Sequence, residues 1–172
     1  ARAMEKAVAM DPNNDEYYFN LGVAYDKLGD FKGTVKAMRR VVAINPKHAS
    51  AYNYIGYLYA ERGENLDESV EAIKKALELE PDNGYFVDSL GWAYYKKGMM
   101  KEAQEVLERA VSLVPEDPVI RDHLGDIYYD LKMNPKAKEQ WEKVLELTPD
   151  DEKVKLKLQK VKTLMEKETS RK

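Results

Sequence analysis

The strongest constraint in this sequence is a proline that returns at an almost constant interval. Five of the prolines are spaced by 34, 35, 34 and 34 residues: Pro12, Pro46, Pro81, Pro115 and Pro149. Four glycines keep the same interval: Gly22, Gly56, Gly91 and Gly125. A fixed period of about 20 to 50 residues is typical of stacked repeat proteins, in which each unit packs on its neighbours. The sequence therefore predicts an elongated array with an extended binding surface rather than a catalytic pocket.

The composition excludes several classes of function. The 172 residues include 28 basic and 31 acidic side chains, which gives a net charge of −3. This balance argues against a nucleic-acid partner, because phosphate neutralisation requires a basic face. The sequence has no cysteine, so disulfides, thiolate metal sites and thiol nucleophiles are excluded. No apolar run approaches the roughly 20 residues of a membrane-spanning helix, so we expect no direct membrane insertion.

Each period divides into two helical stretches. The first is expected at residues 15–28, 50–62, 85–97 and 119–131, where a Leu or Ile precedes the periodic glycine and a tyrosine follows three residues later. The second is expected at residues 32–44, 67–79, 101–113 and 135–147. It ends before the periodic proline, because proline cannot continue a helix.

The periodic glycines lie inside the first helices, where glycine costs about 1 kcal/mol relative to alanine. Their recurrence predicts that a neighbouring helix approaches too closely for a Cβ atom. Pairs of a small and a large residue four positions apart predict the same close packing on the second helices: Thr34/Met38, Ser69/Ile73, Ala103/Leu107 and Ala137/Trp141. Trp141 is therefore interpreted as a core residue.

The turn between the two helices of each period carries its own signal. Gly29, Gly63 and Gly98 are expected to adopt the left-handed conformation that ends many helices. Lys132 occupies the corresponding position in the last copy, so we expect strain there. The additional residue of the 35-residue copy is placed near residues 64–65, where a loop absorbs it without changing the helix phase.

These features together resemble the tetratricopeptide repeat (TPR) family, whose pattern is W-x₂-L-G-x₂-Y, then A-x₃-F, then P, within about 34 residues. The first-helix copies are Tyr18–Leu21–Gly22–Tyr25, Tyr52–Ile55–Gly56–Tyr59, Val87–Leu90–Gly91–Tyr94 and Arg121–Leu124–Gly125–Tyr128. The resemblance covers nearly the whole chain. It implies an all-α fold, a right-handed α-solenoid of antiparallel helix pairs. Two stretches, NYIGYLYAERG and DSLGWAYYKKG, also resemble exported or envelope-associated bacterial members, which leaves both the cytoplasm and the envelope open as locations.

The expected organisation is one TPR array over residues 1–151, followed by a capping helix over residues 152–172 with a frayed end near residues 168–172. The array divides into a half repeat at 1–14 and repeats at 15–48, 49–83, 84–117 and 118–151. Because Ala1 falls in the middle of a repeat, we expect the chain to be a fragment of a longer or processed protein with further repeats upstream.

The resemblance implies that the first helices line a concave groove. The residues that the packing pattern does not use are expected to bind a partner there: Phe19, Val23, Asn53, Tyr57, Tyr85, Asp88, Trp92, Tyr95, Asp122, Asp126 and Tyr129. Aromatic side chains dominate binding hot spots, and the aspartates add negative charge. The predicted ligand is a peptide segment of a protein, apolar with some basic residues. The competing interpretation is that these aromatic residues only pack between repeats.

The leading hypothesis is a non-catalytic interaction scaffold. The alternative is a self-assembly module that forms homo-oligomers through its open terminal repeats, where Ala1, Met4 and Val8 lack a covering helix. RNA binding is disfavoured because the predicted groove is acidic. Enzyme activity is disfavoured because the sequence contains no catalytic motif.

No cofactor or metal site is expected. His48 and His123 are interpreted as solvated or structural residues. Asp122, Asp126 and Asp130 extend over about 12 Å of helix, whereas Ca²⁺ requires its oxygen ligands within about 2.6 Å. The carboxylate-binding members of the family use cationic and amide side chains at positions that carry Phe19, Val23, Tyr54, Tyr85 and Ser89 here, so the C-terminal tails of chaperones are not expected ligands.

Overall fold

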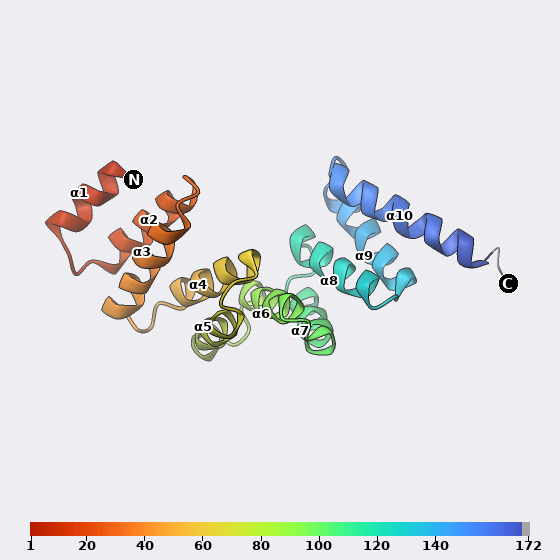
Figure 1. Cartoon of the computed structure of the whole chain (residues 1–172), viewed down its shortest axis with the longest axis horizontal. Helices are drawn as coiled ribbons and strands as arrows, with labels where there is room; N and C mark the ends of the chain where they lie inside the picture. The colour runs from red at the N-terminus through yellow and green to blue at the C-terminus, as the bar shows by residue number, and fades with distance from the viewer. Residues whose placement is uncertain (170–172) are drawn as a thin grey trace. The chain divides into compact units, whose positions relative to one another are not determined.

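The computed structural model describes residues 1–169, which form ten α-helices and no β-strand (Figure 1). The helices are α1 (Arg2–Met10), α2 (Asp15–Asp26), α3 (Phe31–Ile44), α4 (Ala49–Arg62), α5 (Leu66–Leu79), α6 (Gly84–Lys96), α7 (Met100–Leu113), α8 (Pro118–Asp130), α9 (Asn134–Leu147) and α10 (Glu152–Thr169). They group into two compact units, Ala1–Asp82 and Asn83–Lys172. The expected helix limits are reproduced to within two residues.

Each helix pair packs as two neighbours joined by a short turn. In the first unit α2 pairs with α3 and α4 with α5, while α1 packs on α2. In the second unit α6 pairs with α7 and α8 with α9, and α10 packs on α9. Short connections between packed helices give antiparallel pairs, and the expected all-α fold of antiparallel helix pairs is confirmed. The exact limits of the repeats stay a prediction.

The first helices of the pairs begin at side-chain caps that the sequence supplies. The caps of α2, α6 and α8 are Asn14, Asn83 and Asp117, whose side-chain oxygens accept hydrogen bonds from backbone N–H groups of the first turn. His48 has the same role at α4, where its Nδ1 accepts from the N–H of Ala51 at 3.3 Å. These bonds satisfy donors that a helix N-terminus would otherwise leave unpaired.

The periodic glycines lie where the second helix of each pair approaches most closely. A Cβ on Gly91 would lie 2.6 Å from Cγ of Leu107, and a Cβ on Gly125 would meet the indole of Trp141. A Cβ on Gly56 would meet Ile73 and the backbone of α5. The prediction that these glycines permit close helix approach is confirmed.

The turns also follow the expected conformations. Gly29, Gly63 and Gly98 have φ values of 72°, 65° and 76°. Lys132 adopts φ 61°, so the expected strained cap is confirmed for a residue that carries a Cβ. The additional residue is Asn65, at φ 47°, directly before α5.

The core of each pair is built from the small and large residues of the second helices. Thr34, Met38, Ser69, Ile73, Ala103, Leu107 and Ala137 have no exposed surface, and Trp141 is 2% exposed, which confirms its core role. The last described helix is α10, whose Val154, Leu158 and Val161 are buried. Of the expected frayed end, residues 170–172 lie outside the described residues.

Candidate functional site

The predicted partner-binding residues divide between the two units. The first unit holds Phe19 and Val23 on α2, and Asn53 and Tyr57 on α4. The second holds Tyr85, Asp88, Trp92 and Tyr95 on α6, and Asp122, Asp126 and Tyr129 on α8. Each set lies on successive first helices of its own unit.

In the first unit Phe19 of α2 packs against residues of the next first helix and its cap. The ring of Phe19 stacks on His48 at 4.9 Å between centroids and meets the edge of Tyr54 at 6.2 Å. The Tyr54 hydroxyl donates to Oδ2 of Asp26 at 2.7 Å. Burial raises the pKa of the Tyr54 hydroxyl, and its bond to the Asp26 carboxylate raises it further. Phe19 is thus a partly buried contact between α2 and α4, and His48 is structural.

In the second unit an aromatic stack is centred on Trp92. Its ring lies 4.2 Å from the His123 ring and 4.9 Å from the Tyr95 ring, with interplanar angles of 15° and 25°. The ammonium of Lys96 lies 4.6 Å from the centroid of the Trp92 ring. Trp92 is only 9% exposed. The neighbouring aromatic residues therefore cover this ring, as the competing interpretation of packing between repeats expects.

His123 is buried and anchored by a carboxylate. Its Nδ1 donates to Oδ1 of Asp88 at 2.9 Å, and both side chains are about nine-tenths buried. Burial alone would lower the pKa of His123, but the bond to Asp88, with the nearby Asp122 and Asp126 charges, raises it overall. The structural interpretation of His123 is confirmed.

The remaining aspartates of the predicted groove also have partners within the chain. Nζ of Lys157, on α10, lies 2.7 Å from oxygens of both Asp122 and Asp126. Burial raises the pKa of the Asp126 carboxyl, while the Lys157 ammonium opposes that shift. The Tyr95 hydroxyl donates to Oδ2 of Asp130 at 2.7 Å. The aspartates of the expected negative surface are thus bound by side chains of the chain itself, which corrects the expectation that they are free to meet a partner.

These contacts follow one rule that the sequence reasoning missed. Side chains 35 residues apart link successive first helices, and link α8 with α10 in the same way: Phe19 with Tyr54, Asp88 with His123, Asp122 with Lys157, and Tyr95 with Asp130. The sequence did contain a signal for these contacts. Each pair combines two side chains that can stack or hydrogen-bond, separated by one repeat of about 34 residues plus one further position. Positions outside the packing pattern can therefore connect repeats as well as face a partner.

Two apolar side chains of the second unit remain accessible beside this network. Tyr85 and Val119 lie near the starts of α6 and α8 and are 57% and 56% exposed. Tyr85 shares the face of α6 that carries Asp88, Trp92 and Tyr95, because these residues are spaced by three, four and three. They provide accessible apolar surface on α6 and α8, the two helices that carry the aromatic stack.

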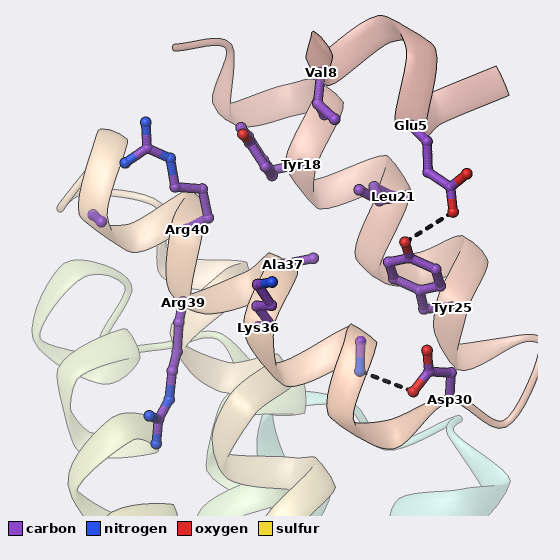
Figure 2. Close-up of a pocket in the computed structure, with 12 residues that line it drawn as sticks. Glu5, Val8, Tyr18, Leu21, Tyr25, Asp30, Lys36, Ala37, Arg39 and Arg40 are labelled. Atoms are coloured by element: carbon purple, nitrogen blue, oxygen red, sulfur yellow. Dashed lines mark hydrogen bonds between the residues drawn. The ribbon is translucent and has the colours of Figure 1, made fainter. Parts of the chain in front are cut away.

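The first unit contains a hollow that the sequence reasoning did not identify (Figure 2). It has a volume of about 680 Å³ and lies among α1, α2 and α3. Its lining includes Val8, Tyr18, Leu21, Lys36, Ala37 and Arg40. The signal in the sequence was the small size of the α3 residues at this surface, with Gly33 and Ala37 both contributing to the lining.

Among residues 1–169, no three His, Cys, Asp or Glu side chains are grouped so that they could hold a metal ion. Over the same part of the chain, every helix is too short or too polar to cross a membrane.

Comparisons with known proteins add a family and a fold. Sequence models described as tetratricopeptide repeat match residues 3–33, 27–84, 88–117 and 120–151. A TPR repeat-containing protein of Pseudomonas aeruginosa is 30% identical over 103 residues, which are 60% of this chain and 18% of that protein. The chain spans 18% of the length of this relative and 23% of the length of a second one, the small glutamine-rich tetratricopeptide repeat-containing protein 2 of Mycosarcoma maydis.

Two solved structures show the same fold. A thermophilic TPR protein of Thermus thermophilus superposes with a TM-score of 0.78 at 22% identity, covering 92% of this chain and 86% of that chain. YrrB, described as a TPR protein with an unusual peptide-binding site, superposes with a TM-score of 0.70 at 22% identity, covering 95% and 84%.

Proposed function

This chain belongs to the tetratricopeptide repeat family, and we propose that it is a non-catalytic scaffold that binds a peptide segment of a protein partner on its first helices. Proteins of this family generally act as protein–protein interaction scaffolds. The proposed contact residues are those selected from the sequence: Phe19, Val23, Asn53, Tyr57, Tyr85, Asp88, Trp92, Tyr95, Asp122, Asp126 and Tyr129. Within this set we assign different roles to exposed and buried side chains.

The observation that carries the proposal is the exposed apolar surface of two side chains of the second unit: Tyr85 from the selected set, and Val119 on α8, which the selected set did not include. Tyr85 and Val119 each expose more than half of their surface. Covering such side chains with an apolar partner gains about 25 cal/mol for each Å² removed from water. The stack of Trp92, Tyr95 and His123 would then form a rigid floor that loses little conformational freedom on binding.

The paired carboxylates define the chemistry of the proposed ligand. A basic peptide residue would have to displace His123 from Asp88, or Lys157 from Asp122 and Asp126. Breaking such partly buried pairs is unfavourable, because it leaves charges without compensation. The proposed ligand is therefore recognised mainly by apolar side chains.

The experiment is selection of a random peptide phage library on the full chain, followed by binding measurements with the selected peptides. We expect an apolar consensus and a change in Trp92 fluorescence on binding. The double variant Tyr85→Ser, Val119→Ser should bind the peptides at least tenfold more weakly. Leu28→Ser is the matched control, because Leu28 is 69% exposed but lies in a turn of the other unit. Equal binding by the double variant and the control would reject the assignment.

The alternative, self-association through a terminal repeat, is favoured by one observation on α1. This helix has an amphipathic sequence like α3, yet it buries none of its residues, whereas α3 buries five. A second copy could cover its apolar side. Light scattering across a wide concentration range tests this alternative, and a strict monomer rejects it.

A further inference from the structure

We propose that the hollow among α1, α2 and α3, here termed the basic hollow, is a second docking site that accepts a short acidic peptide carrying a bulky apolar side chain. This site is separate from the proposed first-helix surface. The inference rests on three properties of the hollow: its apolar floor, the unusual charge of α3, and cationic groups that no carboxylate of the described chain neutralises.

The floor of the basic hollow is apolar and preformed. Figure 2 shows Val8 of α1, Leu21 of α2 and Ala37 of α3 around the same space, with the ring of Tyr18 beside them. The volume of about 680 Å³ falls within the roughly 300 to 1,000 Å³ of typical ligand sites. A space of this size can hold a large aliphatic or aromatic side chain together with part of its backbone.

The charge of α3 distinguishes it from the other second helices. α3 carries Lys32, Lys36, Arg39 and Arg40 and has no acidic residue. The corresponding helices α5, α7 and α9 each contain at least three glutamates. The contrast is sharpest at Lys36, because the equivalent positions carry Glu71, Glu105 and Glu139. This reversal places a positive rim on one hollow of a chain whose net charge is −3.

The acidic residues of the hollow are already engaged, whereas two of its cations are not neutralised. Glu5 accepts a hydrogen bond from the Tyr25 hydroxyl at 2.9 Å, and Asp30 caps α3 by accepting from the N–H of Gly33 at 2.9 Å. Arg40 donates to the neutral carbonyl of Pro12 at 3.1 Å. Within residues 1–169, neither Arg40 nor Lys36 forms an ion pair with a carboxylate.

The size of the α3 side chains explains why the hollow is open. Gly33 lies at a position that carries Glu68, Glu102 and Lys136 in the other second helices. Ala37 is smaller than its equivalents Val106 in α7 and Gln140 in α9, while α5 carries alanine at the same position, Ala72. Small residues at both positions leave space beside α2 that longer side chains would enter.

The combination of an apolar floor with a short cationic rim favours a peptide over a nucleic acid. A nucleic acid needs a long basic track for its phosphates, whereas α3 offers four cations and one of them, Arg39, already pairs with Glu68 at 2.6 Å. An acidic peptide can place one carboxylate near Lys36 or Arg40 and one apolar side chain on the floor. Charge complementarity then sets the specificity, and burial of the apolar side chain supplies the affinity.

The test uses fluorescence anisotropy with the full chain and three synthetic peptides of equal length. The first contains glutamate with leucine and phenylalanine, the second has lysine for glutamate, and the third has serine for leucine and phenylalanine. We expect only the first to bind, with an affinity that falls as salt is added. Lys36→Glu and Ala37→Gln should each weaken binding by roughly fivefold or more. Both substitutions introduce residues that other second helices of this chain carry at the same position, so the fold should tolerate them.

Lys47→Glu is the matched control, because it changes the net charge equally at an exposed residue outside the hollow and should leave binding unchanged. The Tyr85→Ser, Val119→Ser variant should also retain the acidic peptide, which separates this test from that of the first-helix surface. The proposal is overturned if the first peptide does not bind, if Lys36→Glu binds it as tightly as the unmodified chain, or if only a single-stranded oligonucleotide shows binding that depends on Lys36.

Discussion

The imidazole of His123 stacks on the indole of Trp92, with ring centroids 4.2 Å apart and an interplanar angle of 15°. The two residues come from successive first helices, α8 and α6. The same imidazole donates to Asp88 on α6, so one side chain joins the two helices by stacking and by a charged hydrogen bond. This double contact makes the local structure sensitive to pH and explains the burial of Trp92.

Stability should fall as the pH rises through the folded-state pKa of His123. That pKa is raised, because the bond to Asp88 and the charges of Asp122 and Asp126 outweigh the opposing effect of burial. A raised pKa means that the protonated form stabilises the fold. The stabilisation by protonated His123 is fully present below about pH 6.5, the usual pKa of histidine. It is lost at pH values above the folded-state pKa of His123. Urea unfolding at a series of pH values measures it.

The control for the pH effect is His123→Gln, which cannot titrate and should flatten this part of the pH profile. Nuclear magnetic resonance titration of the His123 ring gives the folded-state pKa directly. A midpoint below that of an unstructured histidine peptide would contradict the prediction.

Trp92→Ala should lower the free energy of unfolding by about 3 to 5 kcal/mol, the usual range for a buried aromatic residue. The substitution removes the contacts with His123 and Tyr95 and leaves a void on the face of α6. Tyr85→Ala on the same helix is the control, because Tyr85 is 57% exposed and its loss should change stability by no more than about 0.5 kcal/mol. Equal effects from the two variants would show that Trp92 is not part of the core.

Gly56→Ala should destabilise the chain, whereas Gly22→Ala should be tolerated. A Cβ on Gly56 would lie 2.6 Å from the backbone carbonyl oxygen of Ser69, which cannot move without shifting α5. A Cβ on Gly22 would lie 2.7 Å from the terminal methyl of Met38, at the end of a flexible side chain, and 3.4 Å from Cβ of Ala37, which is close to an ordinary contact distance. We expect a loss of about 1 to 3 kcal/mol for Gly56→Ala and a gain of up to about 1 kcal/mol for Gly22→Ala. Thermal unfolding of both variants measures these changes in stability. If Gly22→Ala were less stable than Gly56→Ala, the packing argument would be refuted.

Lys132→Gly should raise the free energy of unfolding by about 0.5 to 1 kcal/mol. Lys132 holds a left-handed conformation at φ 61°, which costs a residue with a Cβ about 1 to 2 kcal/mol. Glycine removes this strain, but it also increases the conformational entropy of the unfolded chain, which offsets part of the stabilisation. Gly98→Ala is the opposite change at the equivalent turn, where φ is 76° and no atom crowds the site, so only backbone strain should act. Chemical denaturation of both variants should therefore give shifts of opposite sign.

The sequence alone determined the parts of this protein that depend on local chemistry. The periodic proline and glycine predicted every helix pair, the left-handed turns and the close approach at Gly91 and Gly125, because these follow from backbone limits and side-chain size within one repeat. The core role of Trp141 followed from the same spacing. The candidate first-helix surface could be selected as a set of positions, since helical periodicity fixes which residues share a face.

Only the tertiary structure decided which of those residues are free to meet a partner. Whether Asp122 faces solvent or Lys157 depends on where a side chain 35 residues later comes to lie, which requires both helix phases and the packing angle between them. The hollow bounded by Ala37 likewise exists only when three helices are assembled. Backbone conformation is set by neighbours in the chain, whereas the pairing of side chains and the empty space between helices are set by neighbours in three dimensions.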